Sequence, residues 1–196
     1  MIYIAHRINT VEELKKIPKT YGVEIDLRDL GDRLILQHDP FLDGEDFEDY
    51  LKYYEHTIML INIKSERIEI RILEVLKKYN VKNYFFLDSS FGMIYLLTEK
   101  GEKNFALRFS EFEGLDTIMN MQDRVNWIWV DCFTRLAIDK ESYDLLKDAG
   151  FKICLTSPEL LGRPEDISKY KEYISRQGIV FDAVCTKAHN IGKWLE

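Results

Sequence analysis

The chain has 196 residues, of which 46% are hydrophobic and 31% are charged. These fractions are typical of a globular protein and exclude collagen-like, low-complexity and disordered chains. The formal net charge is −7, whereas a protein that binds the nucleic-acid backbone normally carries an excess of lysine and arginine. We therefore expect residues 1–196 to form a single domain that does not bind nucleic acid.

The apolar residues occur in short runs. A helix that spans a bilayer needs about 20 consecutive apolar residues, and the longest runs here, 58–61 and 127–130, are far shorter. The chain passes from Met1 into an apolar stretch and then His6, without the basic segment that opens a signal peptide. These features predict no membrane span and a cytoplasmic protein.

Short β-rich runs alternate with amphipathic helical segments along the whole chain. The runs that predict strands are 2–6, 23–28, 58–64, 84–88, 105–110, 127–133, 152–156 and 183–186. A further run, 34–37, predicts a return strand that pairs with 23–28, and Thr10 with Glu13 forms a capping-box sequence at a helix start. Eight strand-then-helix units predict an α/β fold, a compact (β/α)8 TIM barrel of parallel strands. An open doubly wound sheet is the alternative.

The second predicted strand carries a pair of acids. In a barrel the active site lies at the carboxyl ends of the strands, where the first strand ends in His6 and Arg7 and the second contains Glu24 and Asp26. Because side chains alternate across a strand, the two carboxylates share one face. Carboxylates that share a buried face repel each other, and a divalent cation relieves the repulsion.

Neighbouring strands end in further polar side chains. His38 and Asp39 follow the return strand, and Asn62 and Lys64 share one face of the third strand. Each residue alone is compatible with an ordinary salt bridge. Two histidines, an acid pair and basic residues at the ends of the first strands together predict a catalytic site.

Three spaced motifs carry a resemblance to a known family. They are Ile4-Ala5-His6-Arg7, Gly22-Val23-Glu24-Ile25-Asp26-Leu27-Arg28 and Leu34-Ile35-Leu36-Gln37-His38-Asp39. The order His-Arg, Glu-x-Asp and His-Asp resembles the opening pattern of the glycerophosphodiester phosphodiesterase family. Asn9-Thr10 and Ser90-Phe91 resemble further positions of that family.

The resemblance implies a barrel that binds one divalent cation, Mg²⁺ or Ca²⁺, through Glu24, Asp26 and position 62. The family has a glutamate two residues before Lys64, where this chain has Asn62. An amide oxygen coordinates a hard cation but adds no negative charge, so we expect a lower metal affinity. Asp88, at the end of the next strand, is a candidate for the missing carboxylate.

The resemblance also implies a metal-dependent phosphodiesterase whose substrate is a small-molecule phosphodiester. His6 and His38 would be the acid–base pair, because imidazole exchanges protons near neutral pH. Arg7 and Lys64 would bind the substrate phosphate and neutralise charge that builds in the transition state.

Two departures from the family pattern keep alternatives open. The family usually has a sizeable insertion between the His-Asp motif and the third strand, and here only 40–57 lie between them. The groups that flank the phosphate are therefore expected to differ from those of glycerophosphodiesters. Asn62 favours the alternative of a catalytically impaired barrel that binds a phosphorylated ligand or a partner protein. The sequence leaves the oligomeric state and the choice between hydrolysis and cyclisation open.

Overall fold

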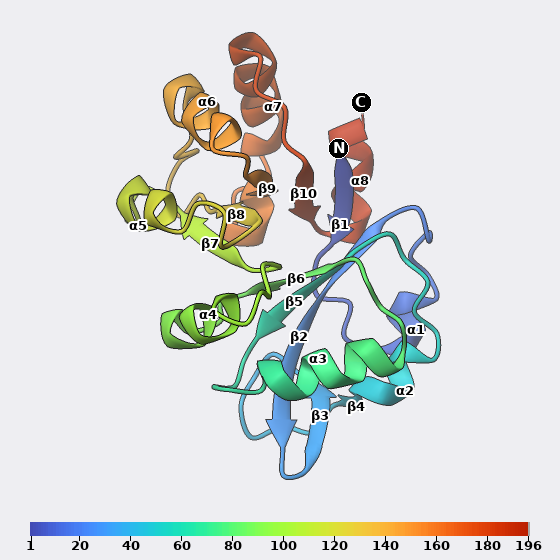
Figure 1. Ribbon diagram of the computed structural model, residues 1–196. Helices are drawn as coiled ribbons and strands as arrows, with labels where there is room; N and C mark the ends of the chain where they lie inside the picture. Colours follow the sequence, from blue (N-terminus) through green and yellow to red (C-terminus); the bar gives the residue numbers. More distant parts are fainter. Residues whose placement is uncertain (196) are drawn as a thin grey trace.

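The computed structural model describes residues 1–195, whose strands form one mixed sheet flanked by helices (Figure 1). The strands are β1 (Ile2–Ala5), β2 (Gly22–Leu30), β3 (Arg33–Leu36), β4 (Glu45–Asp46), β5 (Met59–Ile63), β6 (Tyr84–Leu87), β7 (Ala106–Phe109), β8 (Trp127–Val130), β9 (Lys152–Thr156) and β10 (Ala183–Thr186). The helices are α1 (Val11–Leu14), α2 (Phe47–Leu51), α3 (Glu69–Lys78), α4 (Phe91–Thr98), α5 (Leu115–Asn120), α6 (Lys140–Asp148), α7 (Asp166–Gln177) and α8 (Ile191–Leu195). Two 3-10 helices, η1 (Pro158–Leu161) and η2 (Ala188–Asn190), follow β9 and β10.

The strand order explains why the sheet curls. Parallel pairing runs from β6 through β5, β2, β1, β10, β9 and β8 to β7. The two ends of this path, β6 and β7, meet at one parallel bridge between Phe86 and Phe105. The structure is therefore a curled α/β sheet whose two ends are joined by one bridge. The expected closed barrel would have a continuous hydrogen-bonded ladder at this place. The approach of the two ends also separates the structure from the alternative open doubly wound sheet.

The sheet is mixed because β2 is longer than its neighbours. Its outer half, Leu27 to Leu30, pairs antiparallel with β3, and β3 pairs antiparallel with β4. The predicted return strand is thus confirmed as β3. The predicted capping box is also confirmed: Thr10 accepts a hydrogen bond from the Glu13 N–H, and Glu13 accepts one from the Thr10 N–H.

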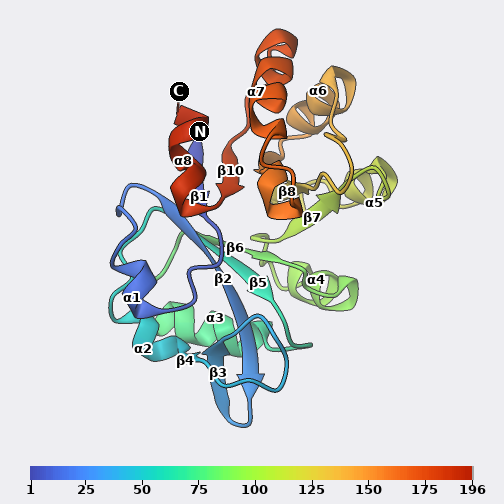
Figure 2. The same ribbon diagram turned by 180° about the vertical axis from the view of Figure 1, so that it is seen from behind.

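The helices pack on the outside of the curled sheet, and β1 lies beside β10, so both ends of the chain lie on the same side (Figures 1 and 2). No helix within residues 1–195 has the length and apolar character needed to cross a membrane.

Two apolar clusters lie on opposite faces of the sheet. The outer one packs between strands and helices, and the inner one takes alternate residues from the parallel strands, as the period of two requires. The inner cluster is built around Phe85, which stacks on Trp127 at a centroid separation of 4.4 Å. Large side chains fill the interior of the curled sheet near the amino ends of the strands. This part of the interior is a packed core rather than a channel.

The inner cluster yields a stability prediction. We expect Phe85→Ala to lower the free energy of unfolding by about 3–5 kcal/mol, because Phe85 is fully buried and its removal leaves a cavity. Phe41→Ala is the matched control, since that side chain is 98% exposed and its loss should change stability by less than about 0.5 kcal/mol. Urea unfolding followed by tryptophan fluorescence measures both. Equal effects would contradict the assignment of Phe85 to the interior.

Candidate active site

The register of the parallel strands brings the predicted site residues to one end of the interior. Ile4 pairs with Gly22 and the ladder continues, so His6 lies beside Glu24. Asp26 is paired directly with Asn62 of β5. Paired residues of neighbouring strands point to the same face. The interior face, apolar at the amino ends of the strands, therefore becomes polar at their carboxyl ends.

Glu24 and Asp26 are each 1% exposed. Burial, together with the adjacent Asp26 carboxylate, raises the pKa of Glu24 well above its ordinary value. A pair of buried carboxylates needs compensating donors or cations, and the structure supplies different ones to each acid.

Glu24 is held by neutral donors. Its Oε2 accepts a hydrogen bond of 2.5 Å from the Arg7 N–H, and its Oε1 accepts one of 3.1 Å from Asn62 Nδ2. Arg7 adopts a left-handed backbone with φ of 57°, a conformation that is uncommon outside glycine. Asn62 Oδ1 is buried and has no hydrogen-bond partner among residues 1–195. No full positive charge therefore lies against Glu24 in this arrangement.

Asp26 is held by cations and by a reciprocal amide pair. Asn9 Nδ2 donates to Asp26 Oδ2 at 2.9 Å, and the Asp26 N–H donates to Asn9 Oδ1 at 2.8 Å. Arg7 Nε lies 3.4 Å from Asp26 Oδ2, and Lys64 Nζ lies 3.5 Å from Asp26 Oδ1. Both predicted phosphate-binding cations are thus paired with the same carboxylate.

The two predicted catalytic histidines have different surroundings. His6 Nε2 lies 3.8 Å from Glu24 Oε2, and burial, with the nearby Arg7 guanidinium, lowers the pKa of His6 to about 4. The His6 ring is therefore neutral at neutral pH, and its contact with Glu24 is not an ion pair. His38 is 38% exposed at its side chain, and its Nδ1 lies 2.8 Å from Asp39 Oδ1.

Backbone contacts attach His38 to the rest of the site. The Gln37 N–H donates to the Asp26 carbonyl at 3.0 Å. Arg28 donates to the carbonyl oxygens of Gln37, His38 and Lys64 at 3.1, 3.3 and 3.2 Å. Six of the seven predicted side chains thus contact either Glu24 or Asp26 or are one of these two acids, whereas His38 is tied to the site through its main chain.

A second ionic cluster borders the acid pair. Lys64 Nζ also lies 3.8 Å from Asp88 Oδ2, and the carboxylates of Asp88 and Asp131 are bound by Arg108. Arg108 Nε lies 3.7 Å from Glu113 Oε1. Asp88 is therefore engaged by two cations, and it shares one of them, Lys64, with Asp26.

Glu24, Asp26 and Asn62 form the donor set that a divalent cation would meet here. All three offer oxygen atoms, which hard cations prefer, and the unpartnered Asn62 Oδ1 is the kind of buried atom that a cation would satisfy. Residues 1–195 contain no group of three His, Cys, Asp or Glu side chains that could hold a metal ion, and the third donor of this set is an amide. The residues fit an oxygen-coordinated cation with two carboxylates.

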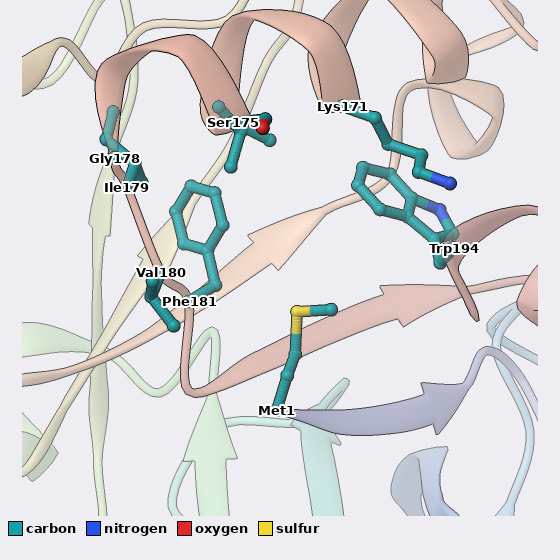
Figure 3. A pocket seen from close by; sticks show the side chains of 9 residues that line it. Met1, Lys171, Ser175, Gly178, Ile179, Val180, Phe181 and Trp194 are labelled. Carbon is teal, nitrogen blue, oxygen red and sulfur yellow. The ribbon is translucent and has the colours of Figure 1, made fainter. Parts of the chain in front are cut away.

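A separate pocket of about 410 Å³ lies at the opposite end of the strands (Figure 3). Met1 and Phe181 line it and precede β1 and β10, and Trp194 of α8 lies on its other side. Lys171 lies at its edge, where its Nζ donates to the Lys193 carbonyl at 2.6 Å. This mostly apolar pocket takes no part in the acid–histidine site.

Solved structures of two bacterial enzymes are similar to this chain. A glycerophosphodiester phosphodiesterase from Agrobacterium tumefaciens str. C58 has a TM-score of 0.69 and 13% identity, covering 96% of this chain and 97% of that one. A glycerophosphoryl diester phosphodiesterase from Parabacteroides distasonis ATCC 8503 has a TM-score of 0.66 and 16% identity, covering 98% of this chain and 85% of that one. This chain has the glycerophosphodiester phosphodiesterase fold. No family model and no curated protein matches its sequence.

The likeness confirms, at the level of the fold, the resemblance read from the three motifs. Within the glycerophosphodiester phosphodiesterase fold, the structure adds residues to which the sequence assigned no role. Arg28 lies on the same face of β2 as Glu24 and Asp26, so strand alternation could have predicted that it belongs to the site. Asn9 lies in the loop after β1, where no periodic pattern points to it, although the family resemblance includes its position.

The reciprocal amide pair yields a second prediction. We expect Asn9→Ala to lower the free energy of unfolding by about 1–3 kcal/mol, because it leaves Asp26 Oδ2 and the Asp26 N–H without their amide partner inside the protein. Asn120→Ala, at an exposed position on α5, should have little effect. Thermal and urea unfolding measure both variants, and an unchanged Asn9→Ala protein would contradict the role given to Asn9.

Proposed function

We propose that this chain is a metal-dependent phosphodiesterase of the glycerophosphodiester phosphodiesterase type, acting on a small-molecule phosphodiester. The observation that carries the proposal is the buried Glu24–Asp26 pair, with His6 at 3.8 Å and the unpartnered Asn62 Oδ1 beside it. This constellation lies at the carboxyl ends of the strands in a fold shared with two phosphodiesterases.

In this proposal the two histidines divide the proton transfers. The neutral His6 ring accepts a proton from the attacking water, which then bonds to phosphorus. His38 gives a proton to the alcohol oxygen as its bond to phosphorus breaks. Asp39, 2.8 Å from His38 Nδ1, stabilises the positive ring that this role requires. The products are a phosphomonoester and an alcohol.

Arg7 and Lys64 neutralise the phosphoryl oxygens in this proposal. Glu24, Asp26 and Asn62 would hold one divalent cation, Mg²⁺ or Ca²⁺, which when bound offsets the buried negative charge and polarises a phosphoryl oxygen. Arg7 and Lys64 are shared with Asp26 at 3.4 and 3.5 Å. A cation on Asp26 would weaken those contacts and make the two side chains available to substrate.

We also propose that the sheet closes into a (β/α)8 barrel and that residues 1–196 act as one domain. The parallel bridge between Phe86 and Phe105 supports closure at the seam. The rings of these two residues also pack together, with centroids 5.2 Å apart. Asp88, which follows β6, and Arg108 of β7 already border the acid pair through Lys64, as closure requires.

Asn62 favours a second candidate function. With an amide in the third donor position, the chain would keep a phosphate-binding mouth but bind the metal too weakly for turnover. That protein would bind a phosphorylated ligand or partner. Such a binding protein would differ from the enzyme in one test: phosphate would raise its melting temperature, but it would hydrolyse no diester.

The enzyme proposal predicts a metal-dependent activity. We expect the purified protein with Mg²⁺ or Ca²⁺ to hydrolyse bis(p-nitrophenyl) phosphate, and EDTA to abolish the signal. His6→Ala and His38→Ala should each lower kcat by about 10²–10⁴-fold, because each removes one proton transfer. His56→Ala is the control, since its Nε2 meets the Ile17 carbonyl at 2.9 Å, outside the site. Activity that survives both EDTA and the two substitutions would exclude this mechanism.

Asn62→Glu tests the donor set directly. It removes the donor to Glu24 Oε1 and adds a third buried carboxylate, so the metal-free variant should unfold at a lower temperature than the unmodified protein. Its affinity for Mg²⁺ should rise about tenfold or more, because added ligand charge tightens binding of hard cations. Calorimetric titration and melting curves with increasing Mg²⁺ measure both effects. Unchanged affinity would show that position 62 does not face the cation.

A further inference from the structure

Most basic side chains at the carboxyl ends of the strands are already paired with carboxylates. Arg7 and Lys64 share Asp26, and Arg108 binds three carboxylates. Lys187 differs: within residues 1–195, no carboxylate oxygen lies within 4.0 Å of its Nζ. It immediately follows β10 and is exposed. An unpaired ammonium beside buried acids is available to an external anion.

The ladder between β1 and β10 gives the position of Lys187. Ile4 pairs with Cys185, and both belong to the inner cluster. Ala5 pairs with Thr186, and the His6 N–H donates to the Thr186 carbonyl at 2.8 Å. The next pair in this register is His6 and Lys187, so their side chains leave the sheet on the same face. His6 therefore has Glu24 on one side and Lys187 on the other.

A buried glutamate fixes the backbone at this point. Glu159 of η1 is 6% exposed, and its Oε1 accepts a hydrogen bond of 3.1 Å from the Lys187 N–H. The hydroxyl groups of Thr186 and Ser157 also donate to Glu159, and Ser157 in turn accepts a hydrogen bond of 2.8 Å from the Trp194 indole. This network ties the ends of β9 and β10 to α8. The base of the Lys187 side chain is thus held in place while its ammonium stays solvated.

We propose that Lys187 is a further phosphate-binding residue of this site, and that it holds a non-bridging phosphoryl oxygen beside His6. The inference rests on the proposed phosphodiesterase function and extends it by one residue. The ammonium would neutralise charge that grows on the phosphoryl oxygens as water attacks. Glu159 is a positioning residue for it, through the Lys187 N–H.

The test compares Lys187→Gln with Lys187→Arg, and uses Lys193→Gln as the control because Lys193 is exposed on the nearby helix α8. Two readouts are measured: kcat and KM for bis(p-nitrophenyl) phosphate with Mg²⁺, and the rise of the melting temperature in inorganic phosphate. We expect Lys187→Gln to lower kcat/KM by about 10- to 100-fold and to lose most of the phosphate-induced rise. Lys187→Arg should retain most of both, and Lys193→Gln should match the unmodified protein.

The outcomes separate this inference from the proposed function. If the unmodified protein hydrolyses the diester and Lys187→Gln matches it in both readouts, the role of Lys187 is overturned and the phosphodiesterase proposal stands. If Lys187→Gln and Lys187→Arg fail equally and both melt early without phosphate, Lys187 is structural and the inference is overturned. If no hydrolysis occurs, but the phosphate-induced rise is present and lost only in Lys187→Gln, Lys187 binds phosphate in a protein without turnover. If neither hydrolysis nor the rise occurs, both proposals fail.

Discussion

Two carboxylates buried side by side on one strand are the constraint on which the rest of the site depends. Glu24 and Asp26 are adjacent on the interior face and are each 1% exposed, and burial together with the Asp26 carboxylate raises the pKa of Glu24. Such a pair is unfavourable for folding unless donors and cations surround it. Neighbouring strands and the loop after β1 supply those partners, which is why polar side chains gather at this end of an otherwise apolar interior.

The two carboxylates differ in how well their buried negative charge is compensated, and this difference affects the chemistry of the site. Asp26 has Arg7, Lys64 and Asn9 as partners, whereas the hydrogen-bond donors to Glu24 within residues 1–195 are a main-chain N–H and the Asn62 amide. The N–H reaches Glu24 because Arg7 adopts a left-handed backbone, a conformation that costs about 1–3 kcal/mol where a side chain is present. The surrounding fold has to stabilise that conformation. The less compensated acid is also the one that lies beside His6.

The parts of the structure that follow a period of two could be predicted from the sequence. Strand alternation placed Glu24 with Asp26 and Asn62 with Lys64, and the short run 34–37 predicted β3 as a return strand. Partners from irregular segments could not be predicted in this way, because no pattern fixes where a loop residue such as Asn9 lies. The single bridge at Phe86 is equally invisible in the sequence, since a strand's composition does not say how many of its residues find a partner. The predicted roles of the site residues remain predictions.

At the carboxyl ends of the strands, the charges differ between the two sides of His6: the acid pair lies on β2 and Lys187 follows β10. A phosphodiester carries one negative charge, so the acid pair repels it unless a cation lies on the carboxylates, whereas the ammonium side of the mouth attracts it in either case. His6 occupies the row between these two sides, next to Glu24 and in register with Lys187. An anion drawn to one side and a cation held on the other would both meet at His6. Loss of metal affinity through Asn62 would therefore leave Lys187 available to phosphate on one side of His6, whereas Arg7 and Lys64 on the other side would stay paired with Asp26.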